Sequence, residues 1–503
     1  MNIVDKYTSD SSSRWQLFGF VGVLVLLVVA LLAPSIITSA LFLGILFLYS
    51  VIFPAKALSF LIIYFPARPF FIETNTHLKV MAEVIIFACL VNILVQNLRN
   101  VKSLFSFYWF EIAYLAFCAI GAISAFLNDV DPVAIVTQLR AFILTYLVFY
   151  ITKRIILNKR DIKWYLWITL IVAFVLSILG IVEKISDKTW LFPVAWEGFA
   201  ISPTNGDRVY GLTKNPNVLA SFLAISFFTS FYLKGILPDW RKYAVWAAMI
   251  VIGTTAVLTY SRGTILSFAG AFVIYVVWKR EWLKTVSIIC TLAVAALLAL
   301  GVVEPVTKAM DVRSTATVLP PGEMPEAPGE EDEGSSNAQL DRIRDSVSES
   351  TLGQSMAGGR LWVVKKGFEV YKDYPIYGSG FATFGDSASL GYGSPIYEKY
   401  DMRPGIYSDN QYIQVIAQTG TLGVIAFACF LIGLFIFLVK NRDIQGYSFV
   451  LLLFVAVVAS SLLYNTWEDK TVTFFLFGMM GVFLSLNKQS QGYVFSERRT
   501  MIS

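Results

Sequence analysis

The chain has 503 residues, of which 56% are hydrophobic and only 15% are charged, whereas about 25% of the residues of an ordinary soluble domain are charged. This composition excludes a water-soluble enzyme, and a net charge of +5 is too small at this length to indicate nucleic-acid binding. We therefore expect an all-α, polytopic integral membrane protein surrounded by membrane lipid, with no nucleic acid among its partners.

Apolar segments recur along the whole chain. A spanning helix needs about 20 predominantly apolar residues, and the segments predict 12–14 transmembrane helices. The range depends on the short third segment and on a tight turn near residue 261. The segments are 16–33, 35–53, 57–66, 78–96, 107–127, 134–151, 163–184, 216–234, 243–260, 263–279, 284–303, 408–439, 447–464 and 470–487.

Basic residues are concentrated on alternate connections between these segments. They are Arg99, Lys102, Lys153, Arg154, Lys159, Arg160, Lys163, Lys234, Arg241, Lys242, Lys279, Arg280, Lys284, Lys440, Arg442, Arg498 and Arg499. Connections rich in Lys and Arg stay on the cytoplasmic side. This rule predicts that both termini are cytoplasmic and that the connections 185–215, 260–263 and 305–407 lie outside the cell.

The same topology predicts the domain organisation. Residues 1–304 would form an N-terminal transmembrane bundle, and 305–407 a long extracytoplasmic loop. Residues 408–487 would form three C-terminal transmembrane helices, and 488–503 a cytoplasmic tail. Within the long loop, the acidic segment 312–350 has too few apolar residues to bury a core, so we expect it to be mobile.

The cysteine and histidine content argues against a metal or a cofactor. None of the four cysteines belongs to a Cys-x-x-Cys pair, and His77 is the single histidine. A thiolate site or a His-rich metal site is therefore not predicted. We expect packing roles for the cysteines, and neither a metal nor a cofactor.

Four arginines fall at the predicted outer side of the membrane: Arg140, Arg208, Arg262 and Arg360. The guanidinium group binds phosphate in a bidentate manner, so four of them on one side favour an anionic substrate. The alternative is that each arginine reaches the interface or pairs locally with a carboxylate. Glu83 and Glu111 are also near span ends, and we expect structural roles for both.

Asp409 and Asn410 stand at the start of the segment 408–439. Asp409 is the carboxylate best placed to accept a proton from an attacking hydroxyl, although an aspartate at this position is also a good helix N-cap. Gln411 and Gln414 extend a polar face into the membrane, which capping does not require. Both interpretations of Asp409 remain open at this point.

Several motifs occur together in one order. They are Arg208-Val-Tyr-Gly-Leu-Thr-Lys-Asn215-Pro-Asn217, Ser261-Arg262-Gly263, Gly359-Arg360, Tyr374-Pro-Ile-Tyr-Gly378-Ser-Gly380-Phe-Ala-Thr-Phe384, and Asp409-Asn410-Gln-Tyr-Ile-Gln414 with Gly420 and Gly423. In this order they resemble the bacterial O-antigen ligase and polysaccharide polymerase family, over about residues 130–485. The resemblance implies a GT-C-type fold with a large extracytoplasmic loop before three final spans.

The resemblance also implies an activity at the outer leaflet of the bacterial cytoplasmic membrane. Such a protein is a metal-independent glycosyltransferase whose donor is an undecaprenyl-diphosphate-linked oligosaccharide and whose acceptor is a glycan or another envelope molecule. Other polysaccharide-assembly proteins would be further partners. By the family pattern Arg208, Arg262 and Arg360, together with Arg140, would contact the donor diphosphate, with Arg262 and Asp409 taking part in catalysis.

The same pattern suggests contacts to the saccharide or acceptor for Asn215, Asn217, Asn410 and Gln414. Ligases of the family usually have His-Asn where this chain has Asp409-Asn410. This departure favours a polymerase, or a ligase to another acceptor, over a ligase to the lipid A core.

Two other functions remain open from the sequence. A flippase or exporter of lipid-linked oligosaccharide would also carry arginines in its spans, but at several depths and in both halves of the protein. A non-catalytic polysaccharide assembly protein would tolerate the loss of Asp409 and of the arginines.

Overall fold

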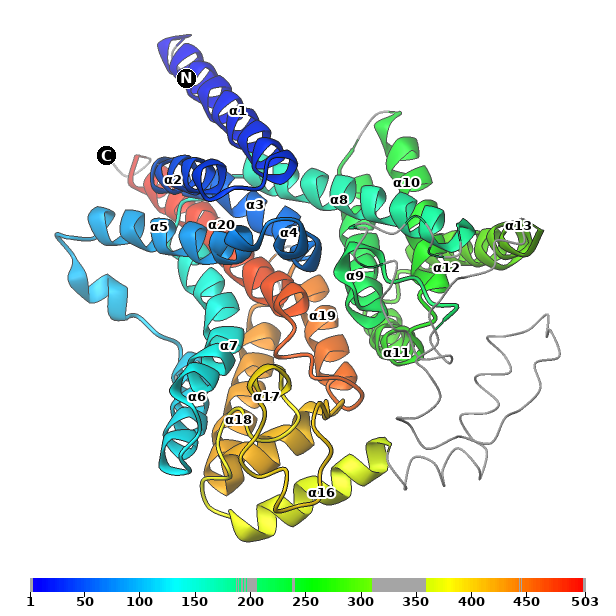
Figure 1. The fold of residues 1–503 in the computed structure, drawn as a ribbon. Helices are drawn as coiled ribbons and strands as arrows, with labels where there is room; N and C mark the ends of the chain where they lie inside the picture. The colour runs from blue at the N-terminus through cyan, green and yellow to red at the C-terminus, as the bar shows by residue number, and fades with distance from the viewer. Residues whose placement is uncertain are drawn as a thin grey trace.

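A computed structural model describes residues 3–309 and 359–500, except residues 187, 189, 191, 192, 194, 195, 197–205, 238, 239, 443 and 445. For residues 3–13, 308 and 486–500 only the backbone is described. The predicted acidic segment 312–350 lies outside the described residues. All regular secondary structure in the described part of the chain is helical (Figure 1).

Ten helical segments in the described part are long and apolar enough to cross a membrane. They are α1 (Ile3–Leu32), α5 (Met81–Gln96) with the preceding η1 (Thr76–Val80), α6 (Trp109–Leu127), α7 (Pro132–Thr152), α8 (Lys159–Ile185), α9 (Pro216–Gly235), α10 (Arg241–Leu258), α11 (Arg262–Lys279), α12 (Trp282–Leu298) continued by η6 (Ala299–Val303) and α13 (Glu304–Ala309), and α18 (Gln411–Lys440). The protein is therefore a multi-pass membrane protein.

The expected number of 12–14 spans is corrected to ten, or eleven if α3 (Pro54–Tyr64) and α4 (Arg68–Thr74), which meet at 83°, count as one bent span among the described residues. The difference comes from shorter apolar helices. These are α2 (Ile36–Ile52), α19 (Tyr447–Ser460) and the part Lys470–Ser485 of α20 (Lys470–Thr500). At 14 residues, α19 is about 21 Å long, less than the roughly 30 Å of a hydrocarbon core.

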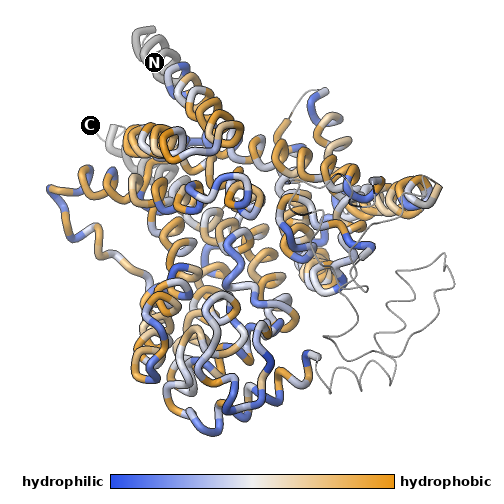
Figure 2. Tube along the Cα trace, in the orientation of Figure 1, coloured by the Kyte–Doolittle hydropathy of each residue, from blue (hydrophilic) through white to orange (hydrophobic). Residues whose placement is uncertain are grey.

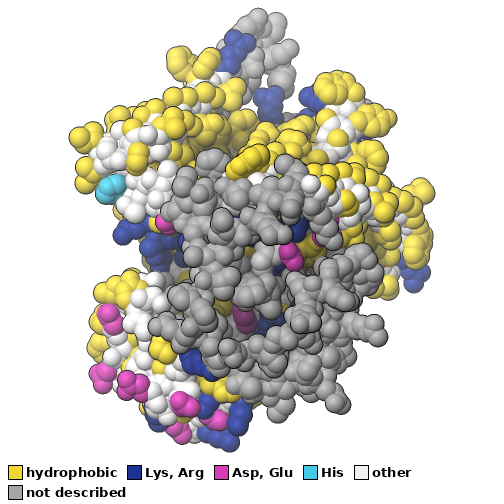
Figure 3. All heavy atoms as spheres, turned by 45° about the vertical axis from the view of Figure 1, so that its right-hand side comes forward, with side chains coloured by type: hydrophobic (Ala, Val, Ile, Leu, Met, Phe, Trp, Pro, Cys, Tyr) yellow, Lys and Arg dark blue, Asp and Glu magenta, His cyan; other side chains and the backbone are white. Residues whose placement is uncertain are grey.

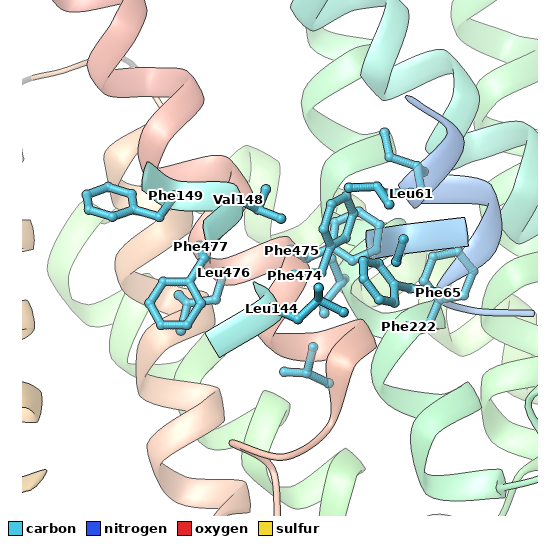
Figure 4. Packing of buried hydrophobic residues seen from close by; sticks show 14 of the residues in the cluster. Leu61, Phe65, Leu144, Val148, Phe149, Phe222, Phe474, Phe475, Leu476 and Phe477 are labelled. Atoms are coloured by element: carbon cyan, nitrogen blue, oxygen red, sulfur yellow. The ribbon is translucent and has the colours of Figure 1, made fainter. Parts of the chain in front are cut away.

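Aromatic side chains fill the centre of the bundle, where α6 packs along α18 and α7 along α20. The Phe117 ring centroid lies 5.5 Å from that of Phe142 and 5.0 Å from that of Phe427. A neighbouring group joins α3, α9 and α20. Figure 4 shows Phe474 and Phe475 close to Phe65 and Phe222. This packing fixes the ends of α7, α18 and α20, which carry the polar residues described below.

Residues 359–410 form a segment with its own small core, which we call the α16–α17 segment after α16 (Arg360–Asp373) and α17 (Ser387–Tyr392). Its buried side chains, including Val370 and Phe384, pack against the first turns of α18. The segment lies at the bottom of Figure 1. The helices above it are mostly apolar (Figure 2), whereas charged side chains gather on its surface (Figure 3).

Backbone contacts join this segment to the bundle. The backbone N–H of Ser379 donates to Ala417 O at 3.0 Å, and that of Phe381 donates to Gly121 O at 3.0 Å. Gly378 (φ 74°) and Gly420 (φ 56°) have left-handed backbones, and a Cβ at Gly420 would lie 2.5 Å from Gly378 N. Both positions therefore need glycine. The motif 374–384 thus attaches the segment to α6 and to the break in α18.

The remaining short elements are η2 (Val101–Phe105) and η5 (Gly211–Thr213). α10 ends at Leu258 and α11 begins at Arg262, so the structure places a tight turn near residue 261. η5 lies between Arg208 and α9 and packs against α4. These connections bring the predicted site residues of distant segments toward one another.

Candidate functional site

Asp409 lies immediately before α18 in a left-handed backbone conformation (φ 47°). Asn410 is the N-cap residue: its Oδ1 accepts hydrogen bonds from the backbone N–H groups of Tyr412 (3.0 Å) and Ile413 (3.1 Å). The interpretation of Asp409 as the helix cap is therefore wrong. A non-glycine residue with positive φ is uncommon and costs free energy. Here the residue is Asp409, whose carboxylate does not cap the helix.

The Asp409 side chain lines a cavity of about 540 Å³ between α16 and the loop that precedes α18. The other charged residues that line it are Arg360, Asp401 and Arg403, and Trp362 and Tyr407 add aromatic surface. Such a mixture of charged and aromatic groups is suited to a polar ligand with hydroxyl and phosphate groups.

Arg360 is a cation that lies beside Asp409. Its Nε lies 4.0 Å from Asp409 Oδ2, and the two side chains are 54% and 40% exposed. Partial burial raises the pKa of Asp409 above its usual value, and the positive charge of Arg360 opposes that rise. The carboxylate is thus a stronger proton acceptor than an ordinary surface aspartate.

A second group forms around Arg208. Its Nε donates to Thr259 O (2.9 Å) and its Nη2 to Asn217 Oδ1 (2.7 Å), which also accepts from Ser261 Oγ (2.7 Å). Asn215 caps α9, since its Oδ1 accepts from the backbone N–H of Asn217 at 2.9 Å. The structure therefore brings Arg208, Asn215 and Asn217 next to the turn at which α11 begins with Arg262.

A third group forms around Arg140. Its Nε pairs with Glu83, and its Nη2 donates to Lys79 O at 3.0 Å. The expected structural role of Glu83 is therefore confirmed, whereas Arg140 is not in direct contact with the other three predicted arginines. Arg140 and Arg68, which is at the start of α4, both lie within electrostatic range of Lys470, at the start of α20.

The connection between α19 and α20, residues 461–469, contacts the surroundings of Asp409 and of Arg262. Ser461 O accepts from the backbone N–H of Gln411 at 2.9 Å, and Tyr464 packs against Tyr407 with 6.2 Å between the ring centroids. A Cβ at Gly263, next to Arg262, would lie 3.2 Å from Leu463 Cδ1. Glu468 lies within electrostatic range of Lys470. This loop thus packs between the surroundings of Asp409 and those of Arg262.

Beneath the cavity lies a buried network that includes Gln414. Its Nε2 donates to Glu468, and its Oε1 accepts from Gln411 Nε2 at 2.7 Å. The side-chain amide of Gln414 is thus bonded within the protein. Its predicted contact with saccharide or acceptor stays a prediction.

Two buried carboxylates in this network share a site. Asp386 caps α17 and accepts from Gln418 Nε2 at 2.5 Å, while Glu468 accepts from the backbone N–H of Ser387 at 3.0 Å. Burial and the negative charge of Asp386 raise the pKa of Glu468 to about 7. Burial also raises the pKa of Asp386. Each carboxylate therefore holds its proton more strongly than an exposed carboxylate would.

The sequence interpretation did not single out Asp386, Glu468, Arg68 or Lys470. A signal for Glu468 and Lys470 was present, because Trp467-Glu468-Asp469-Lys470 places three charges at the border of an apolar run. Ionisable residues at such a border carry a functional hypothesis by default. Arg68 and Asp386 had no comparable signal, because their neighbours come from remote segments.

Among the described residues, no group of three His, Cys, Asp or Glu side chains is placed to hold a metal ion. The described side chains of the site include the Asp409 carboxylate and the Arg360 guanidinium group. A carboxylate can accept a proton from a hydroxyl, and guanidinium groups can stabilise a leaving phosphate.

Comparison with known proteins assigns part of the chain to a family. Residues 247–428 match the family model of the O-antigen ligase. No curated protein matches the chain. The matched stretch includes Arg262, Arg360, Asp409, Asn410 and Gln414, whereas Arg140 and Arg208 precede it. This multi-pass membrane protein is thus similar to the O-antigen ligase over residues 247–428.

Proposed function

We propose that the protein is a membrane glycosyltransferase that polymerises or ligates undecaprenyl-diphosphate-linked saccharide units at the outer face of the bacterial cytoplasmic membrane. The observation that supports this most directly is the position of Asp409. It lines a 540 Å³ cavity beside Arg360, within the stretch that matches the O-antigen ligase. A GT-C-type arrangement of the bundle, with both termini in the cytoplasm, is part of the same proposal.

The transfer needs three events at one place. The acceptor hydroxyl oxygen forms a bond to the anomeric carbon of the donor sugar, the bond from that carbon to the diphosphate oxygen breaks, and the hydroxyl loses its proton. In our proposal Asp409 takes the proton, and lipid diphosphate leaves with the bonding electron pair. The reaction written in this way requires neither a metal nor a nucleotide.

The leaving diphosphate gains negative charge as the bond breaks. Positioned cations stabilise such charge strongly where water is partly excluded. We assign this role to Arg208, Arg262 and Arg360, with Arg140 holding the same lipid substrate further away. The hydrogen bonds from Arg208 to Thr259 O and Asn217 Oδ1 support the assignment, because they fix the orientation of the guanidinium group.

The proposed acceptor follows from residue 409, which is aspartate here and usually histidine in the ligases of the family. Family ligases usually have histidine there, and a chain with Asp409 holds a negative charge next to the acceptor instead of a neutral imidazole. We propose a polymerase, or a ligase to an acceptor other than the lipid A core. Asn215, Asn217 and Asn410 would contact the saccharides.

Substitution of Asp409 tests the proposal. Asp409→Asn keeps the size and removes the proton acceptor, so the transfer rate should fall by about 10²–10⁴-fold. The measurement is the rate of product formation by purified full-length protein with an undecaprenyl-diphosphate-linked oligosaccharide. Asp409→His should retain part of the activity, because imidazole also accepts protons.

Glu398→Gln is the matched control, because Glu398 is an exposed carboxylate of the same segment. It should leave the rate unchanged. Wild-type rates from folded Asp409→Asn protein would remove Asp409 from the chemistry. Loss of product with accumulation of unflipped substrate inside the cell would instead indicate a flippase.

A further inference from the structure

The direction of the Asp409 carboxylate depends on the backbone that carries it. In the described part of the chain this side chain forms no hydrogen bond, and its ion-pair partner Arg360 is 4.0 Å away. The backbone of Asp409 has a left-handed conformation (φ 47°), which costs free energy in any residue other than glycine. Such a conformation persists only where the surrounding structure holds it.

Three hydrogen bonds form a closed ring around the residue that precedes Asp409. The backbone N–H of Ser408 donates to Gly385 O at 2.9 Å, and Ser408 Oγ donates to Asn465 Oδ1 at 2.8 Å. Asn465 Nδ2 donates in turn to Gly385 O at 3.1 Å. The side chains of Ser408 and Asn465 are buried, so water does not compete for these bonds. We call Gly385, Ser408 and Asn465 the 408–465 ring.

The ring joins three segments that are far apart in the sequence. Gly385 precedes α17, Ser408 precedes α18, and Asn465 belongs to the connection between α19 and α20. A Cβ at Gly385 (φ 57°) would lie 2.7 Å from Ser408 N, so this close approach needs glycine. Asn465 can close the ring because its side-chain amide both accepts and donates.

The same connection also holds the chain on the other side of Asp409. The backbone N–H of Gln411 donates to Ser461 O at 2.9 Å, and Gln411 Oε1 accepts from the backbone N–H of Trp467 at 3.0 Å. Asp409 therefore lies between two points, Ser408 and Gln411, that are both bonded to residues 461–467. Over so short a distance along the chain, these bonds fix the backbone from which the Asp409 side chain reaches the cavity.

We propose that Asn465 is a positioning residue for the transfer reaction: through Ser408 and Gly385 it holds the backbone of Asp409 and so directs the carboxylate into the cavity. This inference rests on the proposed function, in which Asp409 takes the proton of the acceptor hydroxyl. Asn465 acts through Asp409 and does not itself contact the substrate.

The effect on the reaction follows from the geometry of proton transfer. A general base must lie within hydrogen-bond reach of the proton that it takes, and a misplacement of about 1 Å can lower a rate by about 10²-fold. Without the ring, the backbone of Asp409 can relax from its left-handed conformation and turn the carboxylate away. Substrate binding by other residues would then continue while the chemical step becomes slower.

Steady-state kinetics of ring variants test the proposal. In purified full-length protein with an undecaprenyl-diphosphate-linked oligosaccharide, Ser408→Ala and Asn465→Ala should each lower kcat by about tenfold to a hundredfold. KM should change by less than about twofold. Ser408→Ala removes only a hydroxyl group, so it keeps the test available if Asn465→Ala does not fold. Ser485→Ala is the matched control, because Ser485 is buried and its Oγ also donates one bond of 2.8 Å, to Ile155 O. It should keep the wild-type kcat.

Two further measurements separate positioning from a loss of stability. Asn465→Ala should lower the rate of the wild type but cause no further loss in Asp409→Asn protein, because the carboxylate that it directs is already absent. A spin label on Asp409→Cys, with the exposed Cys290 and Cys429 replaced by serine, reports the backbone without any reaction. The label should become more mobile when Asn465→Ala is added and stay unchanged when Ser485→Ala is added.

Three outcomes would overturn the proposal. Wild-type kcat in folded Ser408→Ala and Asn465→Ala would exclude a role of the ring in the reaction. An equal loss in Ser485→Ala would indicate a general effect of stability, and an undiminished loss in Asp409→Asn protein would place the action of Asn465 elsewhere. Failure of the proposed function looks different. Folded Asp409→Asn protein with the wild-type rate would overturn the proposed chemistry, whereas the mobility of the spin label would still show whether the ring holds residue 409.

Discussion

Helix α7 forms two ion pairs that differ in their enclosure. At its end, Lys153 Nζ donates to Glu111 Oε1 (2.7 Å) and Oε2 (2.5 Å), and the two side chains are only 3% and 0% exposed. In its first half, Arg140 pairs with Glu83, and these side chains are 34% and 30% exposed. The same helix thus carries a closed pair and an open one.

The surroundings of the two pairs differ in the same way. Tyr146 donates to Glu111 Oε1 (2.8 Å), and Lys153 Nζ also donates to Ser106 O (3.2 Å) and lies among aromatic rings. The closed pair is thus electrically balanced and hydrogen-bonded. Arg140, in contrast, lies within electrostatic range of Lys470, and its pair with Glu83 is partly open to solvent. We infer that the closed pair holds the fold, whereas the open pair contributes little to stability.

The largest expected effect is a difference in stability between variants of the two ion pairs. Lys153→Met leaves the Glu111 carboxylate buried without its cation, and removal of one partner of a buried pair costs about 3–5 kcal/mol. Arg140→Gln should cost less than about 1 kcal/mol, as for exposed pairs. The measurements are the yield and thermal unfolding of the purified protein in detergent.

The double variant Glu111→Gln with Lys153→Met is the control for the closed pair, because it removes both charges and should recover part of the lost stability. Equal destabilisation by Lys153→Met and Arg140→Gln would contradict the distinction between a closed structural pair and an open pair.

The second effect concerns the rate of transfer. Arg208 is held by Thr259 O and Asn217 Oδ1, so Arg208→Ala removes a positioned cation and should lower the rate by about 10²–10³-fold. Arg262→Lys keeps the charge but loses the planar fork, and it should lower the rate less. Arg160→Ala, an exposed arginine in the first turn of α8, should be neutral. Neutral behaviour of Arg208→Ala and Arg262→Lys would make both residues interface anchors.

Hydropathy predicted most of the fold, because a lipid-facing helix must be apolar over its whole length whatever its neighbours. It predicted too many spans where a segment such as α19 is apolar but only 14 residues long. The apolar segment 57–66 corresponds to α3, which turns by 83° into α4. Hydropathy does not indicate such a bend, because a bent helix is as apolar as a straight one.

The site could be predicted only where a motif is local. Asp409 and Asn410 are adjacent in the sequence, yet only the backbone geometry assigns the cap to Asn410. Asp386 and Glu468 are 82 residues apart in numbering, and their proximity depends on how the loop after α19 folds over α17. Arg68 and Lys470 lie within electrostatic range of each other, and this depends on how the starts of α4 and α20 are placed in the bundle.

A third prediction concerns the two buried carboxylates, Asp386 and Glu468. The raised pKa of Glu468, about 7 instead of 4.5, means that the folded protein favours the protonated form. The resulting stability is fully present below about pH 4.5 and is lost as the pH rises through about 7. The loss is roughly 3 kcal/mol at most.

Glu468→Gln cannot ionise, so its thermal stability should vary less between pH 5 and pH 8 than that of the wild type. Both proteins would be compared by thermal unfolding across this range. Asp386, Lys470 and Tyr464 also face this site, so Asp386→Asn should show a similar flattening, whereas the exposed Glu398→Gln should not. Identical pH profiles for wild type and Glu468→Gln would assign the titration to another group.

The smallest expected effect concerns the pair of Arg360 and Asp409 at the cavity. A general base must be ionised, so the transfer rate falls as the pH drops through the pKa of Asp409. Arg360 lowers that pKa, and Arg360→Gln should therefore move the acid limb of the pH–rate profile to higher pH. Exposed pairs contribute at most about 1 kcal/mol, so the displacement should be less than about one pH unit. Lys372→Gln, which removes a charge from the same helix, should leave the limb in place. A limb that moves to lower pH, or that stays in place while the maximal rate falls, would mean that Arg360 acts on the donor diphosphate alone and that the base is another group.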